Sequence, residues 1–115
     1  MTSCGDVLDI RTGAVIHTVA NVGADEIWFN RGDERVYFGG FGFITVPVVS
    51  AIHPFDLITT LTVGKLVGPA VPPFPFNIAL SDTTHSVGAD SENNHIFVPV
   101  THEGVKVYTD ADDDE

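Results

Sequence analysis

The chain has 115 residues, of which 43% are hydrophobic and 18% charged, and its formal net charge is −11. This composition fits one folded domain, or part of one, and excludes a disordered chain. Sixteen acidic residues against five basic ones exclude the clustered positive surface that nucleic-acid binding requires. No apolar run approaches the roughly 18 residues of a membrane-spanning helix, and the start lacks a secretion signal. We therefore expect a cytoplasmic protein with neither nucleic-acid nor membrane partners.

The negative charge is concentrated at the C-terminal end. Residues 110–115 read DADDDE and hold five of the sixteen acids, which leaves five bases against eleven acids, −6, in residues 1–109. We expect this end to be a solvated, disordered tail. The single cysteine, Cys4, excludes an internal disulfide.

Short runs of β-branched and aromatic residues predict strands throughout the chain, and no segment keeps helical spacing for more than a turn. The expected strands are 7–10, 14–19, 26–29, 35–40, 43–48, 57–63, 86–89, 95–100 and 105–109. A proline-rich connection, 64–84, separates the sixth strand from the seventh. Four prolines between 69 and 75 forbid a helix or a central strand there. A connection of this length is typically functional or a disordered insertion.

An internal repeat organises these strands. DEIWFNRGDERVYF (25–38) aligns without a gap with HSVGADSENNHIFV (85–98), at an offset of 60 residues. LDIRTGAVIHTV (8–19) aligns with AIHPFDLITTLTV (51–63) after one insertion. In a four-stranded antiparallel unit lettered a to d, the strand order is then c–d, a–b–c–d, a–b–c. This order is typical of β-propeller blades and predicts an all-β partial propeller over residues 5–109.

Two segments resemble the YVTN-repeat propellers, relatives of the lactonase and gluconolactonase-like propellers. VLDIRTGAVIHTV (7–19) is similar to that family's c strand, Asp-x-x-Thr-Gly turn and d strand, and HSVGADSENNHIFVPV (85–100) to its a strand, turn and b strand. The b-strand tetrads depart from the family pattern, as does His53-Pro54, which replaces the usual acid in the second c–d turn. The resemblance implies a propeller fold. It leaves the activity open, because propellers host lactonases, lyases, electron-transfer proteins and binding platforms.

The number of strands raises the question of ring closure. Known propellers close with about four to eight blades, and this chain supplies about two. We favour a C-terminal fragment of a larger propeller. The alternative is a homo-oligomer in which copies complete a ring, the a–b–c strands of each accepting strand 14–19 of a neighbour.

The propeller interpretation also places a candidate site. In a propeller the d–a and b–c connections share one face, so we expect a ligand-binding rim formed by Asp25, Asn77, Asp82 and His85. His85, His102 and Glu103 are candidate catalytic residues, since carboxylates and imidazoles can hold Ca²⁺ or another divalent metal or act as acid and base. Lactonase-like relatives keep a divalent ion at this location, but no residue here aligns with those ligands, so we assign none. The simpler interpretation is that these side chains only make hydrogen bonds in turns.

Three hypotheses for function follow. The first is a binding or interaction platform for a protein or small-molecule ligand, with 64–84 as the contact surface and no cofactor. The second is part of a lactonase- or lyase-like enzyme with a divalent ion at the channel rim. The third is a truncated product without activity. We interpret the aromatic side chains as core between blades; they are Trp28, Phe29, Tyr37, Phe38 and Phe43.

Overall fold

A computed structural model describes residues 4–109, so the predicted acidic tail (110–115) lies outside the described residues. These residues form antiparallel sheets of two, four and three strands. Sheet I contains β1 (Cys4–Leu8) and β2 (Val15–Ala20). Sheet II contains β3 (Glu26–Asn30), β4 (Arg35–Gly39), β5 (Thr45–Ser50) and β6 (Leu57–Thr62). Sheet III contains β7 (Gly88–Asp90), β8 (His95–Val100) and β9 (Gly104–Thr109).

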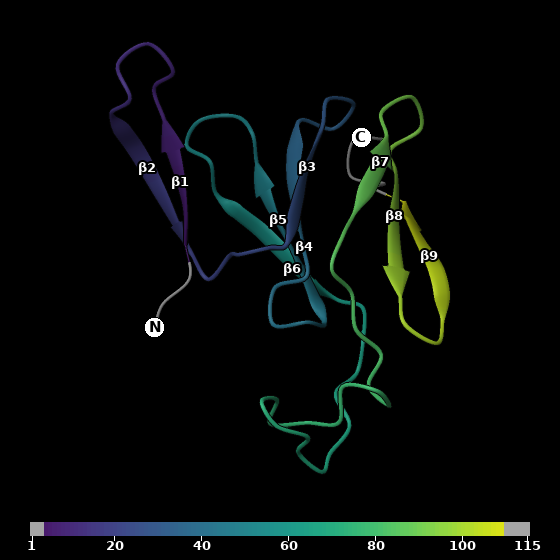
Figure 1. The fold of residues 1–115 in the computed structure, drawn as a ribbon. Helices are drawn as coiled ribbons and strands as arrows, with labels where there is room; N and C mark the ends of the chain where they lie inside the picture. Colours follow the sequence, from purple (N-terminus) through teal and green to yellow (C-terminus); the bar gives the residue numbers. More distant parts are fainter. Residues whose placement is uncertain (1–3, 110–115) are drawn as a thin grey trace.

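The predicted strand grouping, c–d, a–b–c–d, a–b–c, is confirmed. Within each sheet the hydrogen-bonded neighbours follow chain order, and Figure 1 shows the three sheets side by side. The described residues are all-β, and no helix among them is long and apolar enough to cross a membrane.

Turns shift three strands by a few residues from their predicted bounds. The first strand ends at Leu8 because the carbonyl of Asp9 accepts hydrogen bonds from the amides of Thr12 and Gly13, which closes a turn. The fifth strand begins at Thr45, because Gly42 and Phe43 have positive φ and precede it in a tight connection. The seventh strand is only three residues long and begins at Gly88.

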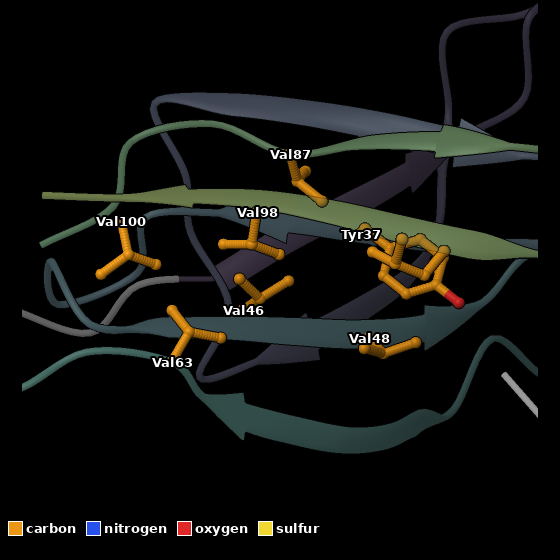
Figure 2. Packing of buried hydrophobic residues seen from close by; sticks show 8 residues of the cluster. Tyr37, Val46, Val48, Val63, Val87, Val98 and Val100 are labelled. Carbon is orange, nitrogen blue, oxygen red and sulfur yellow. The ribbon is translucent and has the colours of Figure 1, made fainter. Parts of the chain in front are cut away.

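The main core lies between sheets II and III. Alternating residues of β8 (Ile96, Val98 and Val100) are buried against Tyr37 of β4 and Val46 of β5. Figure 2 shows this cluster, in which side chains of the two sheets point toward one another. Burial of these apolar surfaces is the main force that holds the two sheets face to face.

A smaller core joins sheets I and II. Val19, Val22 and Val49 are buried there, with Phe38 packed against them. Our expectation for two aromatic side chains is wrong: Trp28 and Phe29 of β3 are exposed rather than buried. Sheet I has only two strands and leaves Phe29 and its neighbour Ile27 uncovered.

Glycine allows the a–b turns of sheets II and III to approach closely. A Cβ atom added to Gly32 would lie 2.2 Å from the carbonyl oxygen of Ser91. Beside it, Nδ2 of Asn30 donates a hydrogen bond of 3.1 Å to Oδ1 of Asn94. Backbone contact and a buried amide therefore fix the two turns against each other.

Candidate functional site

Four connections gather at one end of the sheets and form what we call the loop face. They are 21–25, 40–44, 63–87 and 101–103, at the lower end of Figure 1. The a–b and c–d turns lie at the opposite end. The predicted rim residues all lie in or next to the loop face, and some of their side chains are in contact.

Asp25 and His85 meet directly. Nδ1 of His85 lies 2.7 Å from Oδ2 of Asp25, and both side chains are about half exposed. Because an ionised carboxylate only accepts hydrogen bonds, Nδ1 is the donor in this contact, and Nε2 is left outside it. The imidazole also packs edge-on against Phe43, with ring centroids 6.0 Å apart. The carboxylate and the phenyl ring together fix the orientation of His85.

His102 and Asp82 form a second pair of the same kind. Nδ1 of His102 lies 3.0 Å from Oδ1 of Asp82. The backbone of Asp82 pairs with that of Lys65 through two hydrogen bonds of 2.8 and 2.9 Å, which close the base of the long connection. The hydroxyl and amide of Thr101 both donate to the carbonyl of Thr83, at 3.1 and 2.9 Å. These bonds hold the β8–β9 turn against the long connection.

The other two candidates have different partners. Glu103 forms an ion pair with Lys106, with 2.7 Å between Oε1 and Nζ. Oδ1 of Asn77 accepts from the amides of Ala79 and Leu80 at 3.1 and 3.2 Å, as in a turn internal to the loop. Within residues 4–109, no group of three or more His, Cys, Asp or Glu side chains has the arrangement of a metal site. The rim therefore contains two separate His–Asp pairs.

Lys106 links the loop face to the main core. Its Nζ also donates 2.9 Å to the carbonyl of Val63, just beyond β6, so one side chain joins sheets II and III. The hydrogen bond and charge of Glu103 raise the pKa of Lys106 above its ordinary value, although partial burial acts against this. Lys106 is thus held in its charged form.

The 64–84 connection is built around Phe43. The rings of Phe74 and Phe76 lie 5.7 and 5.4 Å from that of Phe43 between centroids. At the other side of the loop, the buried hydroxyl of Ser81 donates 2.7 Å to the carbonyl of Asn77 and accepts 2.8 Å from the amide of Val67. The loop therefore has its own small core and presents Leu66, Val71 and Leu80 to solvent.

A shallow apolar groove of about 390 Å³ lies beside His85. Its walls come from the end of the long connection and from β8 and β9, including Thr83, Pro99 and Val105. The groove is large enough for a small ligand or a few side chains of a partner.

Comparison with known proteins gives no assignment. No protein-family model, curated protein or solved structure matches this chain.

Sequence reasoning located the histidines and acids but missed their partners. The offset of 60 residues between Asp25 and His85 was a usable signal, since it places them at equivalent positions of the repeat. The anchoring role of Phe43 had a weaker signal, the Phe-Pro-Phe sequence at 74–76, which supplies aromatic rings in an otherwise turn-like segment.

Proposed function

We propose that this chain is part of a β-propeller of the YVTN-repeat type and acts as a binding platform through its loop face. The observation that carries the proposal is the build of the 64–84 connection. It holds three exposed aliphatic side chains, Leu66, Val71 and Leu80, on a loop with its own aromatic core. An apolar surface held in one conformation binds at a lower entropic cost than a mobile one.

Charge supports the same assignment. Residues 64–84 contain one base, Lys65, and one acid, Asp82, in a chain whose net charge is −11. An acidic partner would be repelled by most of this molecule but not by the loop. The contact surface is therefore suited to a protein with an exposed apolar patch, and the groove beside His85 can accept one of its side chains.

The test uses affinity capture from extracts of the source cells, followed by calorimetric titration with the purified partner. The variant L66S/V71S/L80S should weaken binding at least about tenfold, since removal of apolar contacts costs more than 1.4 kcal/mol. The control I10S/I52S changes exposed aliphatic residues in the turns at the opposite end. Equal affinity of the loop variant and the wild type, or equal loss in the control, would refute the proposal.

The second candidate is a lactonase- or lyase-like enzyme with a divalent ion at the rim. One observation favours it: His85 and His102 are both oriented through Nδ1 by a carboxylate, as metal-ligating and general-base histidines often are. In that case Nε2 of each ring would bind the ion or take the proton.

A further inference from the structure

The outward side of sheet III is an exposed apolar surface, which we call the end face. It consists of Phe97 and Pro99 of β8 and Val105 and Val107 of β9. The strand register pairs Phe97 with Val107 and Pro99 with Val105, so all four side chains lie on one side. Phe97, Val105 and Val107 are 36%, 61% and 54% exposed. Contiguous apolar surface of this kind marks an interaction site.

The repeat identifies what the end face is equivalent to. Tyr37 and Phe97 are 60 residues apart, and their partners in the next strand are Val48 and Val107. Tyr37 and Val48 are each 2% exposed, because sheet III covers them. The end face is therefore a second copy of the sheet II surface that forms the main core, without the sheet that would cover it.

A second apolar surface lies at the other end of the chain. We call it the wedge: a cavity of about 520 Å³ between sheets I and II, whose lining includes Val7, Ile27, Val36 and Phe38. Ile27 is 59% exposed and lies opposite Phe38 in the strand register. The wedge is open because, in the part of the chain that the structure describes, sheet I has no strand over β3.

The repeat also shows which buried surface the wedge is equivalent to. Val36 and Phe38 are equivalent to Ile96 and Val98, again 60 residues apart. Ile96 and Val98 are buried in the main core against Tyr37 and Val48. The wedge and the end face thus correspond to the two halves of an interface that this chain already makes between sheets II and III.

We propose that copies of this chain associate head to tail, with the end face of one copy packed into the wedge of the next. The contact repeats the geometry of the sheet II–sheet III core, so a second copy of this chain carries the complementary surface, as in the homo-oligomer alternative stated above. The proposal does not use the 64–84 connection, although Pro99 and Val105 of the end face also line the groove beside His85.

Seating sheet III fully in the wedge requires a strand exchange. β1 and β9 both occupy position c of the four-stranded unit. They therefore compete for the place beside β2, the d strand of the receiving copy. Within residues 4–109, β1 is paired only with β2, and a two-stranded ribbon is marginal by itself. β9 of one copy therefore replaces β1 of the next, as in domain swapping.

Sedimentation equilibrium tests the association. It is done in about 1 M salt, where the screening length of about 3 Å suppresses repulsion between chains of charge −11. We expect the mass of the wild type to rise with concentration above the 12.3 kDa of one chain. V107D on the end face and I27D in the wedge should each raise the dissociation constant at least about 100-fold, since each buries an unpaired charge. I10D, a charge in the exposed β1–β2 turn, should associate like the wild type.

A mixture of the two variants identifies the geometry. V107D keeps an intact wedge and I27D an intact end face, so their equimolar mixture should form a 1:1 dimer and nothing larger. Far-UV circular dichroism checks folding. Any variant that unfolds is replaced by V105D on the end face or by F29D, since Phe29 lies on the same side of β3 as Ile27. Hydrogen exchange should show protection lost in β1 and gained in β9 on association. A wild type that stays monomeric, or a mixture that stays monomeric while the wild type associates, overturns the proposal.

Discussion

Asp25 and His85 stand 60 residues apart at equivalent positions of the repeat, and their side chains touch, with 2.7 Å between Oδ2 and Nδ1. Each lies just before the first strand of its sheet, so the contact ties the loop-face ends of sheets II and III. Both side chains are about half exposed, and exposed pairs contribute little to stability.

We expect D25N and H85Q to show a coupling of about 0.2–1 kcal/mol in a double-mutant cycle, which fits a solvent-screened pair. Urea unfolding of the wild type, the two single variants and the double variant, all at one pH, measures it. Strictly additive effects would contradict this prediction and show that the contact does not stabilise the fold.

Substitution of Ile96 by alanine should destabilise the fold by about 2–5 kcal/mol, because this side chain is fully buried between sheets II and III. Ile10, exposed in the β1–β2 turn, provides the matched control, and I10A should change stability by less than about 0.5 kcal/mol. Chemical denaturation of both variants gives the comparison. Equal losses would mean that the two sheets do not pack as described.

Gly64 should tolerate no side chain. A Cβ atom there would lie 2.0 Å from the carbonyl oxygen of Asp82, inside the backbone pairing that closes the base of the 64–84 loop. Gly68 lies in the same loop with nothing within 4 Å of its added Cβ. We expect G64A to increase proteolysis and amide exchange over 64–84, and G68A to behave like the wild type. Equal exchange in the two variants would contradict the loop structure.

The pH dependence of Lys106 is predictable in sign. The pKa of its ammonium group is raised in the folded state, mainly by Glu103. The stabilisation is therefore complete below the unfolded value of about 10.4 and is lost as the pH rises through the folded value. NMR titration of the lysine side chain should show a lower pKa in E103Q. The stability advantage of the wild type over E103Q should shrink above about pH 10. An unchanged pKa would show that the ion pair is absent.

Metal removal separates the two functional hypotheses. If the loop face is a binding platform, thermal melts with and without chelator should coincide, because neither His–Asp pair has a third ligand among the described residues. If added Ca²⁺ or Mn²⁺ raises the melting midpoint of the wild type but not that of H85Q, the result would instead favour the metal enzyme.

Local patterns predicted the strands well because alternation and turn residues act over a few positions. Val15, Ile16 and Thr18 indicate a strand wherever they are placed. Burial depends on what lies over each side chain, which a local pattern does not encode. Trp28 and Tyr37 are directly paired on the same side of sheet II, yet Tyr37 is 2% exposed in the main core and Trp28 is 47% exposed.

Site prediction reached a similar limit. The repeat and the expected common face brought Asp25, Asp82, His85 and His102 to the same end of the fold. Whether they form one cluster or two pairs depends on ångström-scale side-chain geometry, which spacing does not encode. The path of residues 64–84 was equally beyond prediction. It is set by contacts of Phe74 and Phe76 with Phe43, which lies about thirty positions upstream.

The contact between Asp25 and His85 limits how similar the sequences of the two repeats, 25–38 and 85–98, can become. Two aspartates there would repel each other, and two histidines would both become positively charged in acid. A favourable contact therefore requires different residues at these two equivalent positions. Selection for the contact would prevent the two repeats from becoming identical in sequence.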